Sequence, residues 1–233
     1  MARPTRGTLA SLATNGGATT PHLLSVTCSG ANRGLLTFVQ FRKTGTEEVT
    51  AISRDGQTPT LFATNGSFDG SGWATRVYRL DNANAGAADL SVALNANRNT
   101  IIIAIPYSDL DLAGTPWGTP VRESDMSTEY GASVTADQEL VSIVGALLTA
   151  STTQSFSATG AGHTLLANVH ASFQDQYAAA GYQHELGAVT ASWSFTTTPD
   201  GASNWLVAAN GIASGPSPAA KRRYRRLHLL TAA

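Results

Sequence analysis

The chain has 233 residues, of which 42% are hydrophobic and only 13% charged, against about 25% charged residues in an average soluble domain. This length suits one large β-sandwich or barrel, since such domains run to about 200–250 residues as a single unit. One cysteine excludes an internal disulfide, and no run approaches the roughly 20 apolar residues of a membrane-spanning helix.

The formal net charge of −1 conceals an uneven distribution of charge along the chain. Seven basic residues lie at the two ends: Arg3, Arg6, Lys221, Arg222, Arg223, Arg225 and Arg226. Every acidic residue lies between Glu47 and Asp200, so the body keeps eight basic against sixteen acidic side chains and carries −8. An acidic body with basic ends predicts that the ends are interaction segments.

Residues 1–20 are polar and include Pro4 and a Gly16-Gly17 pair, so we expect an extended arm. They contain no apolar core of a secretory signal. We therefore expect the protein to be made and assembled in a host cytoplasm. Arg3 and Arg6 are the residues through which this arm is expected to bind a partner.

Strand signals begin after the arm and recur at short spacing. Leu24, Val26 and Cys28 alternate with polar residues, as in a half-buried strand. Residues 35–41 are apolar on both faces, which indicates a central strand. Short strands are expected at 49–52, 61–64 and 73–80.

Alternation returns at 90–94, and the apolar run at 100–105 predicts a strand in the middle of a sheet. A long loop is expected at 108–129. Further strands are predicted at 134–136, 140–148, 165–171, 177–186, 189–196 and 205–209. No fixed-period repeat is apparent.

These signals amount to about a dozen short strands, and only the basic segment 219–230 is a helix candidate. An all-β chain of this length has to close into a barrel or pack its sheets face to face. We predict a two-sheet antiparallel β-sandwich of jelly-roll type over residues 21–213. The arm, 1–20, precedes it and a basic tail, 214–233, follows it.

No sulfur or imidazole pattern predicts a metal or cofactor site. Cys28 lies on the inward face with its neighbours, so we expect a small buried apolar side chain. His163 and His170 would point to opposite faces of one strand, and the adjacent His184 and Glu185 match no zinc motif. No cofactor is expected.

Acidic residues gather in three loops. Asp69, Asp109 and Asp111 lack the spacing of a calcium loop, so turn chemistry is the favoured interpretation and a structural cation the alternative. Other acidic residues near the long loop are Glu123, Asp125 and Glu129. They are the best candidates for the paired carboxylates of a polysaccharide-degrading enzyme. We favour a non-enzymatic protein.

Phe68, Trp73 and Trp117 lie in or beside predicted loops, where they could form an aromatic platform for a glycan. The alternative, which we favour, is that these rings cover the ends of the core.

The tail is the most specific feature. Its candidate partner-binding residues are Lys221, Arg222, Arg223, Tyr224, Arg225, Arg226, Leu227, Leu229 and Leu230. Five cations in six residues suit an acidic protein surface or, as a less favoured partner, the phosphates of nucleic acid. The leucines that follow would add an apolar anchor.

The order of several motifs resembles a family of β-sandwich modules found in phage structural proteins and bacterial surface proteins. The motifs are SGANRGLLTF, EEVTAIS, DGQTPTLF, RVYRLDN, IIIAIP, GTPWGTPV, ASWSF and SNWLVAA. The likeness spans about 190 residues, from Leu23 onward, and brings no catalytic residues.

Together with the basic ends, the resemblance implies a phage virion structural protein. Such a protein could be a capsid decoration protein, a head spike or a component of the neck or tail. Capsid, portal or tail proteins and further copies of the same chain would be its partners, without a membrane. A glycan-binding module for host adsorption is the alternative.

Overall fold

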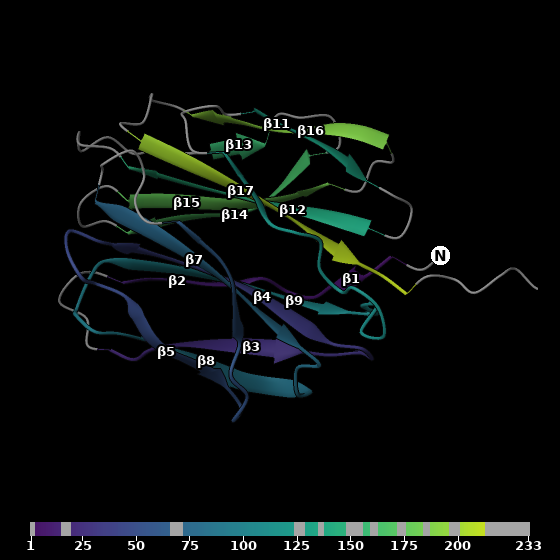
Figure 1. Ribbon diagram of the computed structural model, residues 1–233, viewed down its shortest axis with the longest axis horizontal. Coiled ribbons are helices and arrows are strands. Elements are labelled where there is room, and N and C mark those ends of the chain that lie inside the picture. Colours follow the sequence, from purple (N-terminus) through teal and green to yellow (C-terminus); the bar gives the residue numbers. More distant parts are fainter. Residues whose placement is uncertain are drawn as a thin grey trace, which may run out of the picture.

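The computed structural model describes residues 3–14, 20–65, 72–123, 129–134, 138–147, 156–158, 163–171, 176–183, 187–195 and 201–212. Within these ranges the chain forms strands and loops and no helix. The strands build four antiparallel sheets, which are stacked as layers in Figure 1. We name them, in stacking order, the first outer, first inner, second inner and second outer sheets.

The first inner sheet carries the longest run of buried residues. It contains β1 (Thr5–Arg6), β2 (Ala10–Thr14), β4 (Gly34–Arg42), β6 (Thr60–Asn65), β7 (Trp73–Asp81) and β9 (Thr100–Ser108). Their order is β1-β9-β4-β7-β6, and β2 also pairs with β9. All nine residues of β9 are buried, because both faces of this sheet are covered. The prediction that the isoleucine run lies inside a sheet is confirmed.

The first outer sheet covers one face of the first inner sheet. It has the order β3-β8-β5, with β3 (His22–Cys28), β8 (Gly86–Leu94) and β5 (Val49–Arg54). Burial alternates residue by residue along β3, which confirms the alternation predicted from Leu24, Val26 and Cys28. These side chains pack on Leu35, Val39 and other residues of the first inner sheet.

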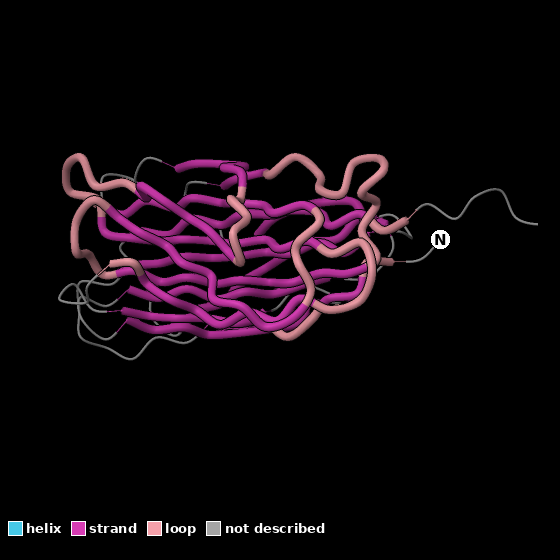
Figure 2. The backbone as a smooth tube through the Cα atoms, turned by 90° about the horizontal axis from the view of Figure 1, so that it is seen from below, coloured by secondary structure: helices cyan, strands magenta, loops and turns pink. Residues whose placement is uncertain are grey.

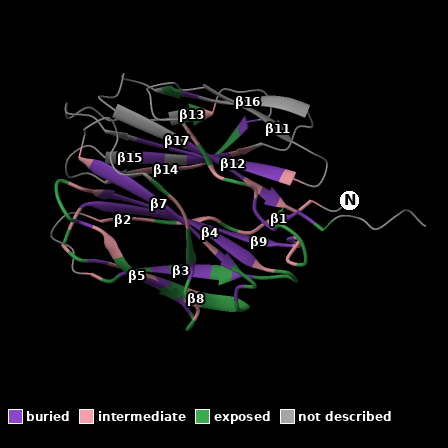
Figure 3. Cartoon of the chain, viewed as in Figure 1, coloured by how far each residue is buried: buried purple, intermediate pink, exposed green. Residues whose placement is uncertain are grey.

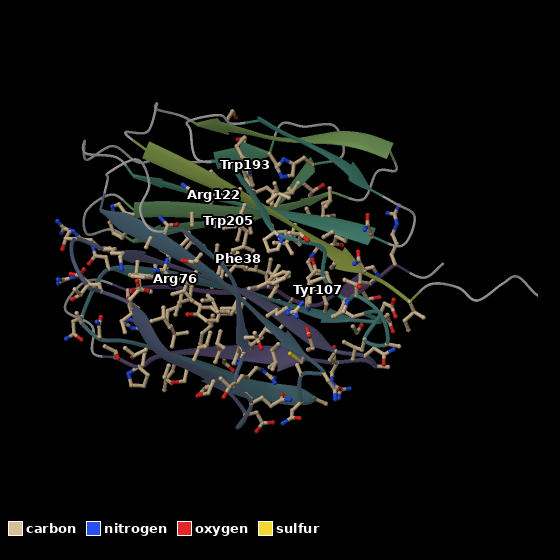
Figure 4. All side chains as sticks on the ribbon, viewed as in Figure 1. Phe38, Arg76, Tyr107, Arg122, Trp193 and Trp205 are labelled. Carbon is tan, nitrogen blue, oxygen red and sulfur yellow. The ribbon has the colours of Figure 1, made fainter. Side chains whose placement is uncertain are left out.

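The second inner sheet covers the other face. Its order is β10-β17-β12-β15-β14, with β10 (Val121–Glu123), β12 (Gln138–Leu147), β14 (His163–Ala171), β15 (Gln176–Gln183) and β17 (Gly201–Asn210). Phe38 and Ile103 of the first inner sheet meet Ile143 and Trp205 of the second in one buried cluster. Figure 4 shows Phe38 and Trp205 on these two facing sheets. Burying one such side chain stabilises the fold by about 1.5–3 kcal/mol.

The second outer sheet closes the stack. It has the order β11-β16-β13, with β11 (Glu129–Val134), β16 (Gly187–Phe195) and β13 (Phe156–Ala158). Trp193 of this sheet reaches the layer below, where its ring meets that of His163 edge to face at 4.7 Å. In Figure 2 the strands of all layers run along the same long direction. Figure 3 shows buried residues concentrated in the inner layers.

The predicted all-β sandwich is confirmed, but the sheets number four among the described residues, where two were expected. The arm also differs from the expectation, because β1 and β2 pair with β9. An uncovered β9 would expose a long apolar edge, and the arm protects it. The expected loop at 108–129 contains β10. The jelly-roll type and the domain boundaries stay predictions, and the helix candidate 219–230 lies outside the described residues.

Candidate functional sites: an interlayer ion pair and a loop groove

A buried polar cluster joins the arm to the second inner sheet. Arg6 Nη1 of β1 lies 2.6 Å from Glu139 Oε1 of β12. The hydroxyl of Tyr107, on β9, donates to the same oxygen at 2.7 Å. The Arg6 guanidinium also stacks 3.7 Å from the ring centre of Tyr182. The side chain of Glu139 is only 1% exposed, so this pair is largely removed from water.

The electrostatics of the cluster hold Arg6 charged. Burial alone would lower the pKa of Arg6, but the neighbouring Glu139 and Tyr107 outweigh it and raise that pKa. Burial and then Glu139 raise the pKa of Tyr107 well above its usual value, so the phenol remains a donor. Arg6 and Tyr107 of the first inner sheet are thus bonded to Glu139 of the second inner sheet, and we call this group of residues the interlayer clamp.

This clamp changes the interpretation of the arm residues. Arg6 was expected to bind a partner, but its charge is already paired inside the chain. Arg3 is described and also has an interaction. A partner-binding role of the arm stays a prediction, and Arg6 could serve it only by leaving Glu139.

A groove opens at one end of the first inner sheet. It has a volume of about 610 Å³ and is lined by Arg79, Asp81, Asn82, Leu112, Gly114, Thr115 and Pro116. Beneath it, Trp117 donates its indole N–H to Asp81 at 2.6 Å. The Trp117 ring also meets the Tyr107 ring edge to face at 5.6 Å.

The aromatic platform that the sequence allowed for a glycan is not formed by the tryptophans. Trp73 and Trp117 are each 2% exposed, because both pack into the interior. This is the favoured alternative, in which the rings cover the ends of the core. Phe68 lies outside the described residues. A glycan in the groove would therefore meet polar side chains and Pro116 instead of indole faces.

A second charged cluster closes the loop that joins β4 and β5. Glu47 accepts hydrogen bonds from the backbone N–H groups of Thr44 and Gly45 and from Arg98 Nε at 3.0 Å. The Arg98 hydrogen bond and the backbone donors lower the pKa of Glu47 to about 2. These bonds hold the loop in place.

Glu48 follows directly and points to other partners. It pairs with Lys43 and with Arg76, whose Nη2 lies 2.6 Å from Glu48 Oε2. Burial opposes ionisation of Glu48, but the two cations outweigh it and lower its pKa. Sequence reasoning missed both clusters, since Arg76 lies 28 residues from Glu48 and Arg98 lies 51 residues from Glu47.

His163 and Cys28 are both buried in the interior. Ser142 Oγ and His163 Nε2 lie 2.6 Å apart, but Ser142 is only 1% exposed and no substrate could reach it. The pair is a hydrogen bond inside the core. Cys28 is fully buried, as expected, and burial raises the pKa of its thiol. No cluster of three metal-ligating side chains occurs in the part of the chain that the structure describes.

The acidic loops behave as turns where they are described. Asp109 has a φ of 60°, and Asp111 accepts a hydrogen bond from the backbone N–H of Gly114 at 3.1 Å. Glu123 and Glu129 lie on β10 and β11, in different sheets, and nothing is described of their side chains. The other predicted residues, Asp69, Asp125, His184 and Glu185, lie outside the described residues, as does the whole tail, 214–233.

Comparison of the chain with protein-family models, curated proteins and solved structures found no match. The resemblance to phage and bacterial surface modules therefore stays a prediction. None of the ranges described in the structure contains a helix long and apolar enough to cross a membrane.

Proposed function

We propose that this chain is a structural protein of a phage virion that assembles with neighbouring proteins through its ends and its sandwich surface. The observation that carries the proposal is the separation of charge along the sequence. A body of charge −8 is followed by a tail with five cations between Lys221 and Arg226. Opposite charges on neighbouring subunits would steer them together and set their relative orientation.

The sandwich suits this role because it is a stiff body. Among the described residues, two buried apolar clusters and the Arg6–Glu139 pair join three of the stacked sheets, and the ring contact of Trp193 with His163 joins the second outer sheet to them. Low overall charge and a surface rich in small residues allow close packing against neighbours. The partners would be capsid, portal or tail proteins and further copies of this chain.

A tail deletion tests the proposal. Removal of residues 219–233 should abolish or strongly reduce incorporation into particles, as measured by quantitative immunoblotting of gradient-purified virions. Removal of 231–233 alone keeps every cation and should leave incorporation unchanged. Equal incorporation of both truncated chains would refute the role of the tail.

Two further variants separate the two kinds of contact. Replacing the five tail cations with glutamine should make incorporation weak and insensitive to salt, since charge pairs are screened by salt. Replacing Leu227, Leu229 and Leu230 with serine should weaken incorporation while its salt dependence remains.

Glycan binding for host adsorption is the second candidate, and the groove favours it. Hydrogen-bonding side chains of Arg79, Asp81, Asn82 and Thr115 line an open groove of about 610 Å³, large enough for a sugar unit. A glycan array probed with the full chain tests this. Thr115→Tyr should abolish binding and Ser53→Tyr, on the exposed face of β5, should not. An array without hits would count against this candidate.

A further inference from the structure

The order of the strands in space occurs twice. In the first copy, β3 to β9, the inner sheet reads β9-β4-β7-β6 and the outer sheet β3-β8-β5. In the second copy, β11 to β17, the inner sheet reads β17-β12-β15-β14 and the outer sheet β11-β16-β13. Each strand of the first copy corresponds to the strand eight places later in the chain. Under this correspondence every strand pairing within the first copy has its equivalent in the second, as β9-β4 has in β17-β12. β10 also pairs with β17 as β2 pairs with β9.

A shared irregularity fixes which residues correspond. In β6 the register shifts between Leu61 and Ala63, and in β14 it shifts between Leu165 and Ala167. A bulge of this kind is a specific feature that bends one strand at one position. The sequence around the two bulges is TLFA at 60–63 and TLLA at 164–167. Two bulges on corresponding strands, in matching sequence, indicate a common origin.

The pairing registers of the strands extend this alignment across both inner sheets. In the first inner sheet, Ala63 beside the bulge pairs with Val77 on β7. Val77 pairs in turn with Phe38 on β4, and Phe38 with Ile103 on β9. In the second inner sheet, Ala167 beside the bulge pairs with Ala180 on β15. Ala180 pairs in turn with Ile143 on β12, and Ile143 with Trp205 on β17. The sequences around Phe38 and Ile143 then align as LLTFV, 35–39, with LVSIV, 140–144. In addition, β8 and β16 both begin with Gly-Ala.

Corresponding residues meet at the contact between the two inner sheets. A cavity of about 10 Å³ lies there, lined by Phe38, Gln40, Thr75, Ile101, Ile103, Ile143, Ala178 and Trp205. Three corresponding pairs are in this set, namely Phe38 with Ile143, Thr75 with Ala178 and Ile103 with Trp205. Corresponding residues of two copies come together where the symmetry axis that relates the copies passes between them, and two equivalent faces packed against each other are related by an approximate twofold axis.

Gln40 and its counterpart Gly145 also touch at this contact. A Cβ atom on Gly145 would lie 2.3 Å from Gln40 Oε1, so the glutamine occupies the space that a side chain on Gly145 would need. Only one of the two copies can place a side chain on the axis. Gln40 is 5% exposed, which shows that its amide is enclosed by the two sheets.

We propose that the chain is a tandem duplicate of one seven-stranded sandwich, whose two copies pack through a pseudo-twofold interface. The partner of each inner sheet is the inner sheet of the other copy, as in a homodimer, but both copies belong to one chain. A C2 interface uses the same patch on both partners. The duplication explains why the described residues form four sheets and why both faces of each inner sheet are covered. It also explains the asymmetry at the axis, since a pair of glutamines there would collide.

An exchange of Gln40 and Gly145 tests this proposal in the full chain. Gly145→Gln alone should lower the Tm, because two amides compete for one space. Gln40→Gly alone should lower it by enlarging the cavity. In the double variant the side chain returns to the axis from the other copy, so more than half of the summed loss of Tm should be recovered.

Additive losses in the double variant would overturn the proposal. If Gly145→Gln does not fold, circular dichroism of the double variant decides the question: a folded double variant supports the proposal, and an unfolded one contradicts it. Leu35→Ala and Leu140→Ala provide the control. These residues also correspond, but Leu35 belongs to the core under the first outer sheet. Leu140 lies on the face of β12 opposite Val141. Their effects should add.

Discussion

Replacement of Arg6 by methionine should destabilise the protein by about 3 kcal/mol. Breaking a buried ion pair from one side costs about 3–5 kcal/mol, because it leaves the other charge buried without its partner. Glu139 is 1% exposed and Arg6 16%, so we expect the lower part of this range. Loss of the stacking on Tyr182 adds to the cost, whereas the retained Tyr107 hydrogen bond reduces it.

Urea unfolding followed by tryptophan fluorescence measures this free energy. In a chain of this size the expected loss corresponds to a fall in Tm of about 6–12 °C. Arg79→Met is a matched control, since its pair with Asp81 spans 3.8 Å with both side chains about a third or more exposed. It should cost below about 1 kcal/mol. A double variant, Arg6→Met with Glu139→Met, should lose less than the sum of the single losses. A loss below about 1 kcal/mol for Arg6→Met would refute the clamp.

Three further predictions concern other buried polar groups. Glu47 has a pKa lowered to about 2, so its contribution to stability is present above its usual pKa near 4.5 and is lost as pH falls towards 2. Glu47→Gln should therefore flatten the decline in stability over that range in pH-dependent urea unfolding. Arg54 is fully buried and donates to the carbonyls of Val26, Asn84 and Gly86, so Arg54→Leu should cost about 3 kcal/mol or more, because three acceptors lose their donor. Unfolding by denaturant checks this, and a loss within error of zero would contradict it. Trp117→Phe removes the bond to Asp81 and should cost about 1–3 kcal/mol, whereas an unchanged Tm would show that the bond does not stabilise the loop.

Local patterns in the sequence predicted the strands well, because side-chain alternation reflects burial directly. The alternation in β3 and the apolar run in β9 are both confirmed by burial. The arm was harder to predict, since the reason it forms strands is the exposed edge of β9, which lies far along the chain. Arg6 and Glu139 are 133 residues apart, and no local signal links them.

The duplication was not apparent from the sequence because the two copies share residue types more than identities. The corresponding strands match mainly in size and polarity, as with Thr37 in LLTFV and Ser142 in LVSIV. The loops between strands differ in length, which removes any fixed period. Strand pairing and the position of the bulge preserve the relation more clearly. Burial of Trp73 and Trp117 agrees with the favoured interpretation of these rings as part of the core, and the sequence alone could not decide between that and a glycan platform.

The virion proposal is tested most directly by the location of the intact chain. Particles produced from the genome that encodes it would be purified on a density gradient, and their proteins quantified by peptide mass spectrometry. The account predicts that the chain sediments with the particles at a constant ratio to the major capsid protein and persists through repeated purification. A chain found only in the free protein fraction would contradict the proposal.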